Sequence, residues 1–396
     1  MKRSPLGIAL ALGCLLPLSA FAQGEAALRI HRTAPVIDGH NDLPWAIRRS
    51  GRAADEIDLR EHQPAFHTDI PRLRRGGVGA QFWSVYVPAD TSDRGESLRT
   101  TLEQIDLVHE LVRRYDDVFE LALTADDIER IRGQGKIASM IGVEGGHSIE
   151  NSLAVLRELY RRGARYMTLT HSRSLDWADS CTDEPRSGGL SPFGEEVVRE
   201  MNRLGMVVDI SHVSADCMRH TLRVTSAPVI FSHSSARAVA DHPRNVPDDV
   251  LRRLPENGGV VMVNFYTAFV EPQEVRRAKR RDELRKDLAT RYPDDPDRGR
   301  AELRKWEVAN PRPNLCTVEH VLDHIEHIIR VAGIDHVGLG SDYDGIPTVP
   351  KGLEDVSTYP AITQGLIDRG YGEADIRKVL GENLMRVFRE VESAAD

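Results

Sequence analysis

The chain has 396 residues, of which 40% are hydrophobic and 29% are charged, and its formal net charge is −9 at neutral pH. A chain this apolar can bury a core of its own, which excludes an intrinsically disordered protein. The acidic balance, without a basic face, argues against nucleic acid as a partner.

The chain begins with the features of a secretory signal peptide. Basic residues at positions 2 and 3 precede an apolar stretch over 6–18, and Ala-Phe-Ala at 20–22 supplies the small-x-small pattern of a cleavage site. We expect cleavage between Ala22 and Gln23, a mature domain over 23–396, and a periplasmic or secreted protein. An uncleaved anchor is the alternative, but the stretch is shorter than the roughly 20 residues that span a bilayer, so no stable membrane anchor is expected.

Eight short apolar runs follow at intervals of a few tens of residues. Most are continuously apolar, which is typical of strands buried on both faces in a parallel sheet that helices cover. The predicted strands cover residues 35–38, 80–85, 138–143, 166–170, 206–210, 228–231, 259–263 and 336–340.

Helical patterns lie between the predicted strands. The segments 152–163, 191–205 and 317–333 each open with a Ser or Thr that can cap a helix and close at a Gly. Strands and helices alternating in this number predict an α/β fold, a single-domain (β/α)8 barrel. A doubly wound open sheet is the alternative, but no glycine-rich phosphate loop follows the first strand.

The segment 274–314 interrupts this rhythm after the seventh predicted strand. It is dense in charges of both signs and has few residues of the kind that form a core. The interspersed Asp and Glu favour a solvated helical insertion over an arm that binds nucleic acid. The sequence does not indicate what this insertion does.

Three cysteines follow the predicted signal peptide, at positions 181, 217 and 316. They are too few and too scattered for a disulfide framework in an exported protein. Whether Cys181 pairs with Cys316 stays open at this level.

Ionisable side chains collect where the predicted strands end. Active sites of (β/α)8 barrels form at the carboxyl ends of the strands, so seven such residues at equivalent positions indicate a functional site, although any one of them alone would suggest a structural role. They are His40, Asp42, Glu144, His171, His212, His233 and Asp342. The first two lie two positions apart, so on an extended strand they point the same way and can reach one ion.

The residue types indicate zinc or a related first-row ion, because imidazole and carboxylate suit such metals. The number of donors favours two ions over one. His40, Asp42, His212 and His233 can supply two ligands to each ion, and the two oxygens of Glu144 can bridge them. Two ions so placed would share a hydroxide.

In combination these motifs resemble the renal, or membrane, dipeptidase family, a branch of the metal-dependent amidohydrolases. The resemblance runs from Val36 to Phe388 and rests on DGHND, GVEGGH, TLTHS, FSHSSA, RNVPDDVL, VMVNFY and GLEDVSTYP. It implies a (β/α)8 barrel that binds two zinc ions and hydrolyses dipeptides, often with a D-residue tolerated at the second position.

The resemblance also implies a role for each matching residue. His40 and Asp42 would hold the first zinc, His212 and His233 the second, and Glu144 would bridge the two together with a hydroxide.

Three further residues receive roles in catalysis from the same resemblance. His171 would contact the substrate carbonyl, Arg244 the substrate carboxylate, and Asp342 would transfer the proton. We therefore expect a zinc dipeptidase that cleaves L,L and L,D dipeptides with a free C-terminal carboxylate. A hydrolase of lactams or other amides, and a non-catalytic binding or tailoring protein on the same fold, stay open as alternatives. The preferred dipeptide, the physiological metal and the oligomeric state, a homodimer included, are not determined by the sequence.

Overall fold

The computed structural model describes residues 18–34, 36–312 and 315–395, with side chains from residue 25 onward. Most of the predicted signal peptide, residues 1–17, lies outside the described residues, and the expected cleavage position falls within helix α1 (Leu18–Thr33). The part of α1 after that position packs on the barrel. Ala27 and Ile30 are buried there, and His31 Nε2 lies 2.5 Å from Thr363 Oγ1 of α15 (Tyr359–Asp368).

Eight parallel strands close into a barrel. Their order around the ring is β2, β1, β9, β8, β7, β6, β5 and β4, and the pairing of β4 with β2 closes it. The barrel strands are β1 (Val36–Asn41), β2 (Val78–Tyr86), β4 (Ile137–Glu144), β5 (Ala164–Thr168), β6 (Val207–Asp209), β7 (Val229–Phe231), β8 (Val260–Val263) and β9 (Val337–Leu339). The predicted single-domain (β/α)8 fold is confirmed.

One strand was not predicted. β3 (Phe119–Leu121) pairs in parallel with the first three residues of β4, with Phe119 opposite Ile137. Three residues are too short for a hydrophobic period to be recognised, and β3 exists because β4 offers it a partner.

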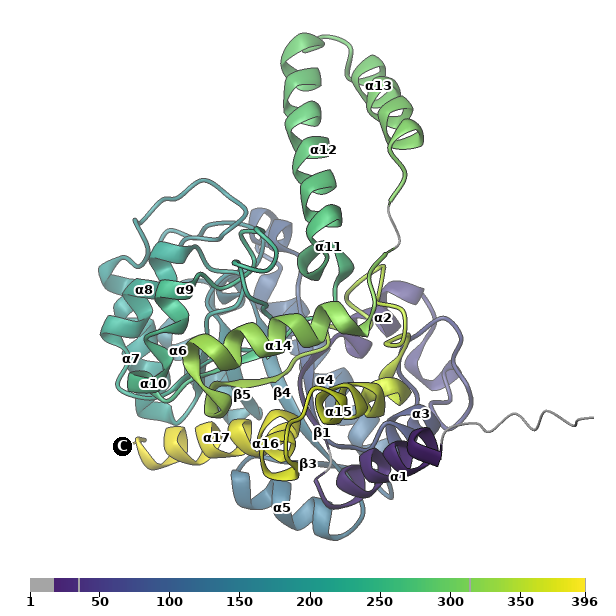
Figure 1. The fold of residues 1–396 in the computed structure, drawn as a ribbon. Helices are drawn as coiled ribbons and strands as arrows, with labels where there is room; N and C mark the ends of the chain where they lie inside the picture. Colours follow the sequence, from purple (N-terminus) through teal and green to yellow (C-terminus); the bar gives the residue numbers. More distant parts are fainter. Residues whose placement is uncertain (1–17, 35, 313–314, 396) are drawn as a thin grey trace, which may run out of the picture.

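Helices connect the strands and form the outer layer (Figure 1). Besides α1 and α15 they are α2 (Leu43–Ser50), α3 (Ile70–Arg75), α4 (Ser97–Arg114), α5 (Ala125–Gly133), α6 (Leu153–Arg161), α7 (Pro192–Leu204), α8 (Ala215–Val224), α9 (Asp248–Leu251), α10 (Leu254–Asn257), α11 (Thr267–Val270), α14 (Val318–Ala332), α16 (Glu373–Arg377) and α17 (Asn383–Ser393). The predicted caps at Ser152 and Ser191 form, since their side chains accept hydrogen bonds from Val155 N and Gly194 N. Across the described ranges, no helix has the length and apolarity needed to cross a membrane.

The predicted insertion is a pair of helices that follows β8, the seventh strand of the barrel. α12 (Pro272–Arg291) and α13 (Pro296–Ala309) lie side by side and project beyond the barrel (Figure 1). The Glu271 side chain caps α12, and Arg281 Nε donates a 2.6 Å hydrogen bond to Glu307 Oε1 between the helices.

Alternate residues of the strands fill the inside of the barrel. Phe82, Met140, Tyr166, Ile230 and Met262 belong to one buried cluster, which Phe388 of α17 also joins, whereas their chain neighbours pack outward against the helices. A filled interior leaves room for chemistry only beyond the ends of the strands. The three cysteines in the described residues are free thiols, so Cys181 and Cys316 do not form a disulfide.

Candidate metal centre

The ionisable residues predicted at the strand ends converge at the carboxyl end of the barrel. They lie at or just after six strands: His40 and Asp42 at β1, Glu144 at β4, His171 after β5, His212 after β6, His233 after β7 and Asp342 after β9. All but His40 line one cavity of about 280 Å³, and His40 is fully buried next to two of the lining residues, Asp42 and Glu144. Arg244, from the loop after β7, lines the same cavity.

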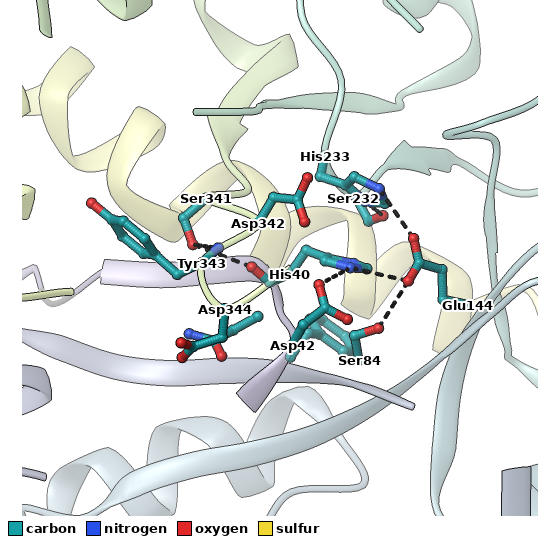
Figure 2. Close-up of polar contacts among 12 residues, drawn as sticks. His40, Asp42, Ser84, Glu144, Ser232, His233, Ser341, Asp342, Tyr343 and Asp344 are labelled. Carbon is teal, nitrogen blue, oxygen red and sulfur yellow. Dashed lines mark hydrogen bonds and ion pairs between the residues drawn. The ribbon is translucent and has the colours of Figure 1, made fainter. Parts of the chain in front are cut away.

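Glu144 stands between two pairs of donors. Its Oε2 lies 3.5 Å from His40 Nε2, which is itself 3.2 Å from Asp42 Oδ2. Its Oε1 lies 3.0 Å from His212 Nε2 and 3.3 Å from His233 Nε2. Figure 2 shows Glu144 facing His40 and His233 in this way. One carboxylate oxygen therefore faces each pair, which is the arrangement that a bridging ligand needs.

The state of the imidazoles suits a metal. His40 Nε2 is buried and has no hydrogen-bond partner, while its Nδ1 lies 2.8 Å from Tyr166 Oη. Ser232 Oγ donates its only proton to Asp209 Oδ2 at 2.6 Å, so it accepts from Nδ1 of His233 at 2.7 Å. That leaves the lone pair of His233 Nε2 directed at the cluster, and such an outer hydrogen bond is what orients a histidine ligand. The donor set fits a first-row ion such as zinc.

Two residues expected to bind substrate lie on the cavity wall. His171 Nε2 is 3.9 Å from Glu144 Oε1, and its ring packs 4.8 Å from that of Tyr86. Arg244 is only 2% exposed. Its Nη1 donates to Ser234 Oγ at 3.2 Å and its Nη2 to the carbonyl of His233 at 3.0 Å.

Comparison with known proteins identifies the family. A sequence model of the membrane dipeptidases, peptidase family M19, matches residues 25–396. The chain belongs to the membrane dipeptidase family. It is therefore a metal-dependent dipeptidase, a hydrolase, and the predicted family is confirmed.

Solved structures agree with this assignment. The probable dipeptidase PvdM from Pseudomonas aeruginosa has a TM-score of 0.82 at 24% identity, over 95% of this chain and all of that one. A metallopeptidase from Rhodobacter sphaeroides, liganded with a phosphinate mimic of the dipeptide L-Ala-D-Ala, has a TM-score of 0.74 at 25% identity over 90% of this chain and 99% of that one. The dipeptidase AC, a metallopeptidase of family M19, has a TM-score of 0.73 at 25% identity, over 90% of this chain and 98% of that one.

Burial and neighbouring groups together set the protonation of the dipeptidase site. Burial alone would raise the pKa of Glu144, but the surrounding His40, His212 and His233 hold its pKa well below the ordinary value. Burial lowers the pKa of both His212 and His233 well below the ordinary value, so both rings are neutral, which is the form that binds a metal. Burial, assisted by nearby carboxylates, raises the pKa of Asp342 well above its ordinary range.

The backbone of the dipeptidase is unusual at two of these residues. His212 and Asp342 have φ angles of 65° and 64°, in the left-handed region that residues other than glycine seldom occupy. Close by, a Cβ on Gly345 would lie 2.2 Å from Asp42 Oδ2 and 2.6 Å from Asp342 Oδ1, so a side chain at this position would displace these two carboxylates. No feature of the sequence predicted the two left-handed residues.

Several residues that orient the candidate metal ligands were not identified from the sequence. Ser84 Oγ donates to Glu144 Oε2 at 3.2 Å, and Asn264 Nδ2 donates to Asp342 Oδ2 at 2.8 Å. Tyr166 also belongs to this group because its hydroxyl contacts His40 Nδ1. Asp209 belongs to it because it accepts a hydrogen bond from Ser232, which contacts His233 Nδ1. All four are polar residues in or next to otherwise apolar strand runs, and that exception to the pattern is the signal that could have found them.

Proposed function

We propose that this chain is a dipeptidase with two zinc ions that hydrolyses dipeptides bearing a free C-terminal carboxylate, in both L,L and L,D configurations. The observation that carries the proposal is Arg244, a buried cation on the wall of the cavity that holds the metal donors. Among the described residues it has no carboxylate partner, so the partner it lacks is an anion of the substrate. The dipeptide mimic bound to the Rhodobacter sphaeroides relative supports the same substrate class and the D-configuration.

The residues that would hold the two ions follow from the distances to Glu144. His40 and Asp42 would hold one, His212 and His233 the other, and Glu144 would supply an oxygen to each. Bound zinc supplies Lewis acidity and lowers the pKa of the water that it coordinates.

The remaining residues place the substrate and move its proton. Arg244 binds the terminal carboxylate of the substrate. The scissile carbonyl then lies one residue away from that carboxylate along the peptide. Burial lowers the pKa of His171 to about 4, so its neutral ring donates one hydrogen bond to the carbonyl oxygen as negative charge develops there.

Asp342 supplies the proton that the leaving amine needs. Burial raises the pKa of Asp342, which favours holding a proton, and Asn264 donates to Oδ2, which leaves Oδ1 to carry it. Water attacks the carbonyl carbon and gives one proton to Asp342, the C–N bond breaks, and the amine leaves with the proton from Asp342, so the carboxyl group returns to its starting state. The products are two free amino acids.

Two measurements on purified protein test this proposal. The zinc content is measured, and L-Ala-L-Ala, L-Ala-D-Ala and a β-lactam are offered as substrates. We expect about two zinc ions per chain and release of alanine from both dipeptides. A zinc-loaded protein that cleaves the β-lactam and neither dipeptide would favour the alternative amide hydrolase, and one that cleaves none of the three would favour a binding protein.

We further propose that the protein is exported to the periplasm or beyond. This rests on the basic residues, the apolar stretch and the small residues within positions 1–22.

A further inference from the structure

Helix α2 and Asp42, the N-cap residue that precedes it, present a line of three side chains to the cavity. Asp42, Trp45 and Arg49 are spaced three and four residues apart, so they share one face of the helix, and all three line the cavity. Asp42 is one of the proposed zinc ligands at the start of this line. Trp45 packs edge-on against Tyr86 at 5.1 Å between ring centres, and Arg49 lies at the exposed end.

Arg49 has no counter-ion. In residues 18–34, 36–312 and 315–395 no carboxylate lies within ion-pair distance of it, and no hydrogen bond from its guanidinium is formed. Its neighbour Arg48 contrasts with it: Arg48 points away from the cavity and pairs with Glu103 of α4 at 2.7 Å. The cation on the cavity wall is therefore the unpaired one, and the adjacent cation on the outer face is paired.

Arg49 and Arg244 belong to distant parts of the barrel rim. Arg49 follows β1, whereas Arg244 follows β7, which is three strands away in a ring of eight. Both residues line the same cavity, which is also lined by four of the five proposed metal ligands, Asp42, Glu144, His212 and His233. A dipeptide whose carboxylate is held by Arg244, with its scissile carbonyl over the donors, therefore directs its first residue toward α2.

We infer that Arg49 binds an acidic side chain on the first residue of the substrate, so that the enzyme prefers dipeptides beginning with glutamate or aspartate. The inference rests on the proposed function, because it uses Arg244 to orient the substrate. A carboxylate on the first residue would form an ion pair with the unpaired Arg49, whereas a neutral or basic side chain would not. Trp45, one turn earlier, would contact the methylene groups of the same side chain.

The expected preference is modest because Arg49 is exposed. A solvent-exposed ion pair between enzyme and substrate changes kcat/KM by about two- to fivefold. We expect kcat/KM for L-Glu-L-Ala to exceed that for the isosteric L-Gln-L-Ala by about this factor at low salt. Added salt screens exposed charges, so the ratio should fall toward one at about 0.5 M NaCl.

The test is the Glu-to-Gln ratio of kcat/KM, measured on the zinc-loaded enzyme and three variants. Arg49→Gln should bring the ratio to about one, and Arg49→Lys should keep most of it because the charge is retained. Arg48→Gln is the matched control, since this neighbouring arginine is paired outside the cavity, and it should leave the ratio unchanged.

Cleavage of L-Ala-L-Ala in the same assay separates the two proposals. If L-Ala-L-Ala is cleaved but the wild-type ratio is one, or if Arg49→Gln keeps the wild-type ratio, the inference about Arg49 is overturned and the proposed function stands. If no dipeptide is cleaved by the zinc-loaded protein, the proposed function fails and the inference fails with it.

Discussion

Removing the charge from the substrate's carboxylate is the most direct test of how the site selects dipeptides. Arg244 is buried, and its two protein hydrogen bonds go to neutral acceptors, Ser234 Oγ and the carbonyl of His233. Its Nε has no partner at all. A carboxylate that meets this guanidinium therefore forms a charge-assisted hydrogen bond in a site that water reaches poorly.

The size of the effect follows from the energy of such a bond. Hydrogen bonds to charged groups contribute about 1.5–3 kcal/mol, and about 1.4 kcal/mol corresponds to a factor of ten in rate. Replacing L-Ala-L-Ala by its C-terminal amide should therefore lower kcat/KM by roughly 10- to 150-fold, with about thirtyfold as the central value. A tripeptide should also be a poor substrate, because its carboxylate lies one residue too far from the scissile bond.

The assay compares initial rates of alanine release from the dipeptide and its amide at equal zinc content. Arg244→Lys should lose part of the discrimination, since an ammonium group cannot reproduce the two-pronged geometry of guanidinium, and Arg244→Gln should lose nearly all of it. Arg237→Lys is a control on the same loop, because Arg237 does not line the cavity. Equal kcat/KM values for the dipeptide and its amide in the wild-type enzyme would refute the reasoning, and Arg244 would then be a structural residue.

Three further predictions concern the metals, the N-terminus and the pH dependence of stability. Glu144→Gln should lower zinc content at both positions and His40→Ala chiefly at one, as measured by elemental analysis; one zinc per chain in fully active wild-type enzyme would contradict the two-ion arrangement. The exported protein should begin near Gln23 by mass spectrometry, and an intact Met1 would contradict the signal peptide. Burial lowers the pKa of His324 to about 4, against 6.5 when unfolded, so the unfolded chain binds the extra proton between these values and stability should fall by up to about 3 kcal/mol as the pH drops from 6.5 to 4. His324→Gln should flatten this fall in urea titrations, and equal slopes in variant and wild type would count against it.

The short-range patterns of the chain were enough to predict the architecture. Most barrel strands lie on largely apolar runs, and Ser152 and Ser191 cap their helices as their positions indicate, because such signals depend only on residues a few positions apart. The seven ionisable residues were also found in this way, since the carboxyl end of every parallel strand lies at the same end of a barrel. The short strand β3 was not predicted, because its pairing with β4, and not the pattern of its own three residues, makes it a strand.

Closure of the barrel determined everything that depends on contacts between distant parts of the chain. Tyr166 reaches His40 across 126 positions of sequence, and Asn264 reaches Asp342 across 78. Which oxygen of Glu144 faces which histidines, and which of the adjacent Arg48 and Arg49 lacks a partner, are likewise settled by how the strands are ordered and staggered around the ring. A sequence pattern indicates which secondary structure a segment favours, because that depends on residues close together in the chain. Distances between side chains on different strands are set only when the whole sheet has closed and its interior has packed.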